Sequence, residues 1–223
     1  MRSSRRRVFI VDDHPLVREW LGGMIDNEAD LQVCGQAEDG PTALASVPLA
    51  DPDIVIVDLT LPRSSGIELI KDLRAQFANL KMLVLSMHDE VSIAERAFRA
   101  GANGYVVKRD SSERIIEGIR TVLSGKVYAS STLTAQLAEK MFGGIGRKEA
   151  PAEELLSDRE LEVFRLRGQG RTPGEIAAYL KVSIKTVGSY DARIKTKLGL
   201  DNAAELLRAA VRWNDSRSGS TSV

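Results

Sequence analysis

Cysteine and histidine are nearly absent from this sequence of 223 residues, which contains one cysteine and two histidines. A single thiol excludes a disulfide within the chain, and so few nitrogen and sulfur ligands leave no cluster for a structural zinc ion. Aromatic residues make up only 5% of the chain, so its cores must be mainly aliphatic. The formal net charge of zero neither favours nor excludes a nucleic-acid partner.

Long apolar runs are also missing. No segment approaches the roughly 20 apolar residues that a membrane span requires. The basic stretch 1–7 is followed only by the short apolar run 8–11, which ends at two aspartates, so it does not form a signal peptide. We therefore expect a cytoplasmic protein with no membrane partner. The length favours two domains.

The first half of the sequence alternates between β-type runs and segments with helical spacing. Five strands that alternate with five helices predict an α/β doubly wound, five-stranded parallel sheet of the flavodoxin-like order 2-1-3-4-5 over residues 1–127. The predicted strands are 8–11, 31–37, 53–59, 80–87 and 104–107, and the predicted helices are 15–26, 40–47, 66–77, 89–100 and 111–123.

The second half has no strand pattern. Residues 128–152 read as a linker that contains a helix at 131–142, and residues 214–223 as a disordered tail. Capping boxes at 157–160 and 172–175 and the cap Ser183 predict short helices in 153–213, a small all-α four-helix domain. Two of its helices flank a tight turn at 181–182, which is a helix-turn-helix arrangement. Its core is predicted from Ile176, Ala177, Leu180, Val182, Val187 and Ile194.

Polar side chains follow four of the predicted strands. Asp12 and Asp13 end the first strand, Asp58 the third and Ser86 the fourth, and Lys108 follows the fifth. In the order 2-1-3-4-5 these positions share one sheet edge, at the switch point where such sheets bind ligands. Three clustered carboxylates repel one another, so we expect either a bound cation or a raised pKa on one of them. Oxygen ligands favour Mg²⁺ as that cation.

This set of residues can support phosphoryl transfer. Asp58 can act as a nucleophile and form an aspartyl phosphate, Lys108 can balance the added charge, and Ser86 can donate a hydrogen bond. Each residue alone is more typical of an ordinary strand end. Their joint occurrence at one sheet edge favours a functional site.

Four segments closely resemble the receiver domains of bacterial two-component response regulators, over residues 7–125. They are VDDHPLVRE at 11–19, VDLTLPRSSGIEL at 57–69, LSMHDE at 85–90 and AGANGYVVK at 100–108. The resemblance implies that Asp58 is the phosphoacceptor, and that Asp12, Asp13, Asp58 and the backbone carbonyl of Thr60 bind Mg²⁺. It further implies phosphoryl contacts from Ser86 and Lys108, with Tyr105 as the aromatic switch residue. A half-buried ring on the last strand is the alternative for Tyr105.

Two positions depart from the usual receiver pattern. Arg109 stands where many receivers have proline, which argues against a cis peptide bond there. Met87 stands where many have a small residue, and a bulky side chain there is expected to limit the access of water and prolong the life of the phosphoryl group.

Residues 153–213 resemble the LuxR-type DNA-binding domain of NarL/FixJ response regulators, through S-D-R-E-x-E-V, E-I-A-x-x-L and S-x-K-T-V. The resemblance makes 183–198 the recognition helix that enters the major groove. The predicted DNA contacts are Lys185, Thr186, Val187, Gly188, Ser189, Tyr190, Ala192, Arg193, Lys195 and Lys197.

Base recognition is expected to be weak. The positions from which relatives read bases align with Gly188, Ser189 and Ala192, none of which is a long bidentate donor. Asp191 is expected to repel phosphate, so dimerisation should supply much of the affinity. An apolar face on the last helix is the predicted dimer surface, unless it only closes the core of the domain. Its residues are Ala204, Leu207, Ala210 and Val211.

The sequence thus predicts a non-enzymatic response regulator. A sensor histidine kinase would phosphorylate Asp58, a homodimer would form, and the dimer would bind promoter double-stranded DNA, with RNA polymerase as a further candidate partner. Three alternatives are a haloacid-dehalogenase-like phosphatase, a ligand-sensing LuxR regulator and a receiver that works without phosphorylation. Asp58 does not begin the D-x-D nucleophile motif that the first requires, and the second has no use for the acidic residues.

Overall fold

A computed structural model of the chain describes residues 5–61, 65–87, 91–142 and 152–218. Its contacts divide the chain into two compact units, residues 1–145 and 146–223, which we describe separately. No helix in these described ranges is long and apolar enough to span a membrane.

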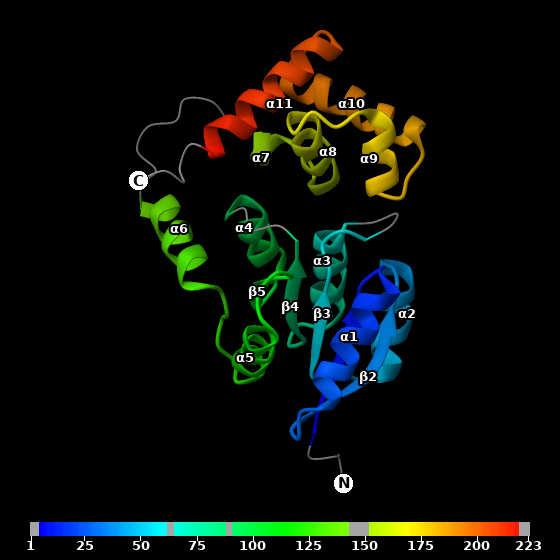
Figure 1. Ribbon diagram of the computed structural model, residues 1–223, viewed down its shortest axis with the longest axis vertical. Helices are drawn as coiled ribbons and strands as arrows, with labels where there is room; N and C mark the ends of the chain where they lie inside the picture. The colour runs from blue at the N-terminus through cyan, green and yellow to red at the C-terminus, as the bar shows by residue number, and fades with distance from the viewer. Residues whose placement is uncertain (1–4, 62–64, 88–90, 143–151, 219–223) are drawn as a thin grey trace. The chain divides into compact units, whose positions relative to one another are not determined.

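A five-stranded parallel sheet in the order β2-β1-β3-β4-β5 forms the centre of the first unit (Figure 1). This confirms the predicted topology. The strands are β1 (Arg6–Val11), β2 (Leu31–Ala37), β3 (Ile54–Val57), β4 (Lys81–Ser86) and β5 (Gly104–Val107).

Helices cover both faces of the sheet. They are α1 (Pro15–Asp26), α2 (Gly40–Ala50), α3 (Gly66–Gln76), α4 (Val91–Ala100) and α5 (Ser112–Leu123). Over the described residues each agrees with its predicted segment to within one residue, except that α2 continues three residues past the predicted end at 47, through Pro48, and stops at Asp51 with a left-handed φ of 40°. Residues 89–90 of the predicted helix 89–100 lie outside the described residues.

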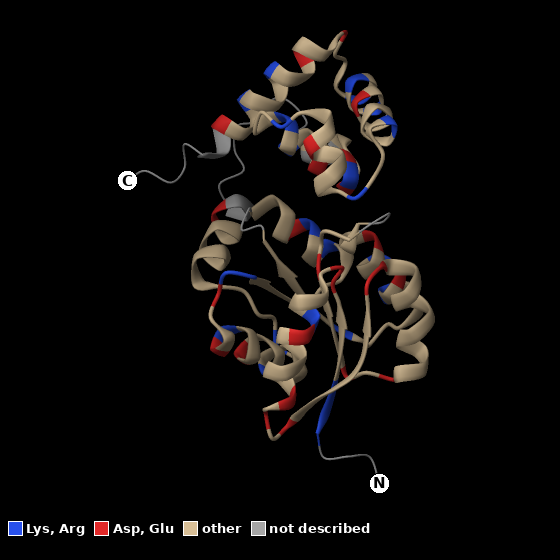
Figure 2. Cartoon of the chain, turned by 45° about the vertical axis from the view of Figure 1, so that its right-hand side comes forward, with Lys and Arg blue, Asp and Glu red and all other residues tan. Residues whose placement is uncertain are grey.

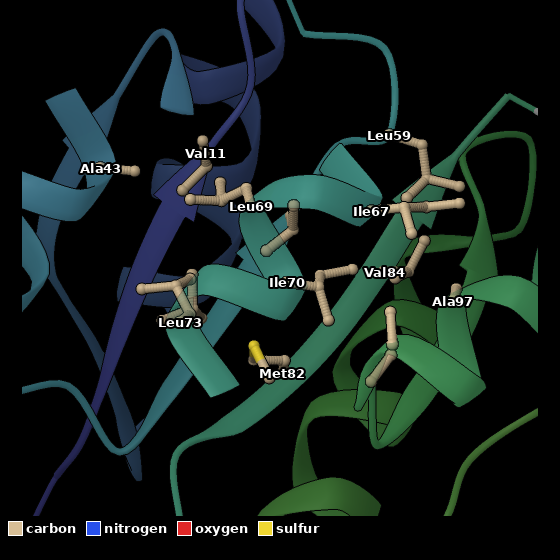
Figure 3. Close-up of a cluster of buried hydrophobic side chains, with 14 of the residues drawn as sticks. Val11, Ala43, Leu59, Ile67, Leu69, Ile70, Leu73, Met82, Val84 and Ala97 are labelled. Atoms are coloured by element: carbon tan, nitrogen blue, oxygen red, sulfur yellow. The ribbon is translucent and has the colours of Figure 1, made fainter. Parts of the chain in front are cut away.

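Alternating side chains on each strand build the two halves of the core. Phe9 and Val11 of β1 pack with α2, α3 and α4, whereas Val8 and Ile10 pack with α1 and α5. Strands β1, β3, β4 and β5 are mostly buried and consist mainly of β-branched and other aliphatic residues, as expected for a covered parallel sheet, whereas the edge strand β2 is only partly buried. Figure 3 shows one of these layers, in which Leu69, Ile70 and Leu73 of α3 lie beside Val11, Met82 and Val84 of the sheet, among other labelled residues.

The chain after α5 stays attached to the sheet. Tyr128 accepts a hydrogen bond from the amide of Tyr105 (2.8 Å) and donates its own amide to Asn103 (3.1 Å), so it lies along the free edge of β5. Gly104 and Gly118 make room for its side chain, because a Cβ at either position would approach Tyr128 to 3.1–3.2 Å. The following helix, α6 (Ser131–Phe142), packs Leu133 and Leu137 on the core beside α4. The compact unit therefore extends past the predicted boundary at residue 127.

The second unit is entirely helical in its described part. It comprises α7 (Ala152–Leu155), α8 (Asp158–Gly168), α9 (Pro173–Tyr179), α10 (Ile184–Leu198) and α11 (Ala203–Ser218). Both predicted capping boxes are present, at Ser157–Glu160 and Thr172–Glu175. Ser183 caps α10, and Gly199 ends it in the left-handed region, with a φ of 63°.

The predicted disordered tail from residue 214 is wrong for its first part, because α11 continues to Ser218. Two contacts explain this extension. Asn214 donates its side-chain amide to the carbonyl of Arg165 (3.1 Å), and the ring of Trp213 lies 5.8 Å from that of Phe164. Residues 219–223 lie outside the described residues, as do 143–151 of the predicted linker.

Candidate functional site

Parallel pairing brings the two central aspartates together. Val11 and Val57 are partners in the register of β1 and β3, and Asp12 and Asp58 directly follow them. The amide of Asp58 donates to the carbonyl of Val11 (2.8 Å), which fixes the turn at the end of β3. Both carboxylates are nearly buried, with exposures of 1% for Asp12 and 3% for Asp58.

Lys108 joins these two carboxylates. Its ammonium nitrogen lies 2.5 Å from Oδ2 of Asp12 and 2.9 Å from Oδ2 of Asp58. Its backbone amide donates to the carbonyl of Ser86 at 2.7 Å, so the ends of β4 and β5 hold the lysine in place. Residues that are 96 and 50 positions apart from Lys108 in the sequence thus form one charged cluster.

Burial raises the pKa of the Asp58 carboxyl to about 6. The positive charge of Lys108 opposes this shift, and the negative charge of Asp12 adds to it. Burial lowers the pKa of Lys108, but attraction to Asp58 and Asp12 outweighs burial and raises it overall. Lys108 is therefore charged at neutral pH, as a residue that stabilises a phosphoryl group must be.

The acidic cluster has the donor set of a Mg²⁺ site. One potential ligand atom from each of Asp12, Asp13, His14 and Asp58 lies within 4.8 Å of the others. Three of these residues are carboxylates, the hard oxygen ligands that Mg²⁺ prefers. Because the aspartates outnumber the one lysine between them, the cluster suits a divalent cation.

His14 belongs to this cluster, although the sequence did not single it out as a site residue. Its Nδ1 lies 2.7 Å from Asp13 and 3.3 Å from Asp12, and its amide donates to Asp12 at 2.8 Å. Its position directly after the two aspartates was the available signal. The ring is half exposed.

The remaining predicted receiver residues lie on or just after β3, β4 and β5. The amide of Thr60 donates to Oδ1 of Asp58 at 3.2 Å. Ser86 is completely buried at the end of β4. The ring of Tyr105 is 1% exposed and packs in the core on the α4 side, which is an inward position and not the half-buried alternative. Met87 is 62% exposed, so its side chain lies at the surface beside the buried Ser86.

Gly66 supports the site and was not among the predicted site residues. Its amide donates to the carbonyl of Leu59 (2.9 Å), and a Cβ on it would lie 2.1 Å from the carbonyl oxygen of Asp58. The start of α3, capped by Ser65, therefore packs directly against the backbone of the phosphoacceptor candidate. The motif S-S-G-I-E-L contained this glycine, but a sequence does not show which backbone atoms will lie above it.

In the helical unit, α9 and α10 flank the turn at Lys181, whose φ of 51° is left-handed. The predicted core is confirmed: Ile176, Ala177, Leu180, Val187 and Ile194 are buried, and Val182 packs against them. Val187 was also predicted to contact DNA. That prediction is wrong, because the side chain is fully buried between the helices.

Two charged residues of α10 are paired within the unit. Lys197 lies 2.6 Å from the buried carboxylate of Glu160, so its charge is already balanced. Asp191 forms a two-point ion pair with Arg167 of α8. The expected repulsion between Asp191 and phosphate is therefore largely cancelled by Arg167.

The exposed side of α10 combines basic residues with small and hydroxyl-bearing residues. Lys185, Gly188, Ser189, Ala192 and Arg193 are exposed. Tyr190 is half-buried with Arg193 against its ring, 6.0 Å from the ring centre. Figure 2 shows that the helices of this unit carry both acidic and basic residues.

The predicted dimer face on α11 divides into two parts. Ala210 is fully buried in the core of the helical unit, so it cannot form part of a dimer surface. Ala204, Leu207 and Val211 are exposed, with exposures of 45% and 37% for the last two. Leu206, which was not singled out, closes the core in place of its neighbour Leu207.

Comparisons with known proteins agree with this division of the chain. Residues 8–120 match the response regulator receiver domain family, and residues 154–210 match the luxR family of bacterial regulatory proteins. The oxygen regulatory protein NreC of Staphylococcus aureus is 33% identical over 210 residues, which cover 92% of this chain and 97% of NreC.

Solved structures show the same likeness. A LuxR-family response regulator from Aurantimonas is 34% identical over 62% of this chain and 99% of its own, with a TM-score of 0.59. RcsB from Salmonella enterica serovar Typhimurium, bound to a promoter with the phosphomimetic BeF₃⁻, is 28% identical over 92% of this chain and 98% of its own, with a TM-score of 0.60.

A receiver fold with a clustered acidic site, followed by a helix-turn-helix unit, defines a phosphorylation-controlled transcription regulator. The chain belongs to the two-component response regulators of the NarL/FixJ type.

Proposed function

We propose that Asp58 is the phosphoacceptor and that a sensor histidine kinase supplies the phosphoryl group. The observation that carries this proposal is the position of Lys108, whose ammonium bridges Asp58 and Asp12 in a nearly buried site. An oxygen of Asp58 attacks the phosphorus of a phosphohistidine, the P–N bond breaks, and the histidine nitrogen leaves with the electron pair. Lys108 then faces the added negative charge.

Asp12, Asp13, Asp58 and the carbonyl of Thr60 are the residues proposed to hold Mg²⁺. When bound, this cation neutralises charge on the phosphoryl oxygens. Ser86, at the end of the neighbouring strand, is proposed to donate a hydrogen bond to the phosphoryl group, and Tyr105 to keep its inward position when Ser86 does so. The same residues can promote the chain's own phosphorylation and dephosphorylation.

Acetyl phosphate and Mg²⁺, followed by intact-protein mass spectrometry, test this proposal. We expect the mass of one phosphoryl group on the wild-type chain and none on Asp58→Asn. Asp53→Asn, at the opposite end of β3, serves as the matched control and should be phosphorylated normally. Phosphorylation that persists in Asp58→Asn, or none in the wild-type chain, contradicts the proposal.

Phosphorylation is proposed to promote a homodimer that binds two half-sites of promoter double-stranded DNA. α10 is proposed to enter the major groove, with contacts from Lys185, Thr186, Gly188, Ser189, Tyr190, Ala192, Arg193, Lys195 and Lys197. Val187 leaves the predicted set because it is buried. Lys197 stays in the proposed set, since its side chain is 40% exposed although it pairs with Glu160. Contact with RNA polymerase would follow from such promoter binding.

Met87 is expected to prolong the life of the phosphoryl group. Its large exposed side chain lies next to Ser86, where it can hinder an attacking water. Met87→Ala should therefore shorten the half-life of the phosphorylated chain severalfold. The half-life is measured by mass spectrometry, as the decay of the phosphorylated species with time. Leu49→Ala, a change at another exposed apolar residue, in α2, should leave the half-life unchanged. Equal half-lives for wild type and Met87→Ala would contradict this role.

A further inference from the structure

The exposed side of α10 has an apolar ridge next to a polar one. Ile184, Gly188 and Ala192 follow one another at intervals of four residues, so they lie on one line along the helix. All three are exposed, and Ile184 is 62% exposed at the first turn. A branched apolar side chain at this position adds nothing to the core of the helical unit.

The fold does not account for Gly188. A Cβ built on it meets no atom within 4 Å, so alanine would fit there without a clash. Glycine in a helix interior weakens the helix relative to alanine. The absence of a side chain leaves the helix backbone open to a close approach at this point.

Hydrogen-bond donors on the same side are few. The hydroxyl of Ser189 donates to the carbonyl of Lys185 (3.1 Å), and that of Thr196 to the carbonyl of Ala192 (3.1 Å). The neighbouring ridge places Lys185 and Arg193 on either side of Ser189, where cations can contact phosphates beside a groove.

We infer that this ridge recognises thymine methyl groups in the major groove, with Ile184 as the specificity-determining residue. The thymine 5-methyl is the one apolar group that base pairs present in the major groove. Gly188 and Ala192 let the helix approach the bases, and the side chain of Ile184 covers a methyl. This inference rests on the proposed DNA-binding role of α10.

Replacing thymine with deoxyuridine tests the inference without changing the protein. Half-sites are first selected from random duplexes with the full-length chain and beryllofluoride. Each selected thymine is then replaced by deoxyuridine, which removes only the methyl group. We expect the affinity to fall roughly fourfold at each contacted thymine, the effect of burying one such carbon. If none of the replacements of a selected thymine with deoxyuridine lowers the affinity of the chain for the duplex, the inference is overturned.

Two neighbouring variants identify the residue. Ile184→Ala should bind thymine and deoxyuridine duplexes equally at the contacted position, whereas Lys185→Ala should weaken both alike and keep their ratio. Gly188→Leu should bind the selected duplex at least tenfold more weakly, with an unchanged melting curve by circular dichroism. If Ile184→Ala still binds the thymine duplex more tightly than the deoxyuridine duplex by the wild-type ratio, another residue contacts the methyl group and the role of Ile184 is overturned. If no duplex is enriched at all, the proposed DNA binding fails instead.

Discussion

Asp58 is an acidic residue whose burial opposes the ionisation of its carboxyl group. Its carboxyl pKa is about 6 in the folded chain and near 3.8 without the fold. Between these two values the folded state binds more protons than the unfolded state, so the free energy of unfolding falls as the pH rises. At neutral pH the ionised carboxylate weakens the fold by up to about 3 kcal/mol.

Asp58→Asn should therefore raise the free energy of unfolding at pH 7 by about 1–3 kcal/mol. Loss of the ion pair between Lys108 and Asp58 reduces this gain. Urea unfolding in metal-free buffer measures this difference, which should shrink as the pH is lowered from 7 to 4.5. Glu19→Gln, an exposed change on α1, is the control and should have little effect. A variant less stable than wild type at pH 7 would show that burial of the charge carries no net cost.

At this scale the sequence predicted most of the charged cluster at the edge of the sheet. Asp12, Asp58 and Lys108 could be found because each follows a strand, and parallel strands end at one edge. His14 and Gly66 were missed for different reasons. His14 joins the site through a turn, and Gly66 through a backbone approach, and neither follows from strand order.

At the scale of elements, α3 must begin at a glycine to pack against the end of β3. Gly66→Ala places a Cβ within van der Waals overlap of the Asp58 backbone. We expect a loss of more than about 2 kcal/mol in the free energy of unfolding, the scale of overpacking and backbone strain in a core, and slower phosphorylation. Gly23→Ala provides a matched control in α1, where a Cβ meets no atom within 4 Å. That change should stabilise the chain by about 0.5–1 kcal/mol.

Gly66→Ala with wild-type stability and a wild-type phosphorylation rate would show that α3 can shift without disturbing Asp58. Thermal unfolding and the rate of phosphorylation by acetyl phosphate are the two measurements, and the Gly23→Ala control is measured in the same buffer.

The ion pair between α8 and α10 has a separate consequence. Arg167→Ala leaves the charge of Asp191 unbalanced on the recognition helix, so DNA affinity should fall about tenfold at low salt. Arg167→Ala combined with Asp191→Asn should recover most of this loss, and Asp191→Asn alone should change affinity little. Fluorescence anisotropy at several salt concentrations measures all three variants. If the double variant binds as weakly as Arg167→Ala, Arg167 contacts DNA itself.

The sequence was less informative about such pairs between elements. The caps of α8, α9 and α10 were predicted, because a cap lies within four residues of its partner. The partners of Asp191 and Lys197 lie 24 and 37 residues away on another helix, and only packing brings them together. Val187 was assigned to both core and DNA for the same reason, since one helix face cannot be told from another until its neighbours are placed.

For the whole molecule, phosphorylation should act through association of two chains. The exposed Leu207 and Val211 of α11 remain the proposed dimer surface. Leu207→Asp should lower affinity for DNA with two half-sites at least tenfold, and leave affinity for a single half-site unchanged. Sedimentation with beryllofluoride, followed by anisotropy on both duplexes, measures this difference. Equal losses on both duplexes would place Leu207 in the fold of the helical unit and not in a dimer.

The strand-edge position of Tyr128 matters to anyone who builds chimeric regulators from this chain. The carbonyl of Tyr128 accepts the hydrogen bond that the amide of Tyr105 donates at the edge of β5, and α6 covers apolar side chains beside α4. A receiver module cut after Leu123 would expose a bare sheet edge, which favours aggregation. A module that ends after Phe142 keeps that edge paired, so a foreign output domain is best joined beyond α6.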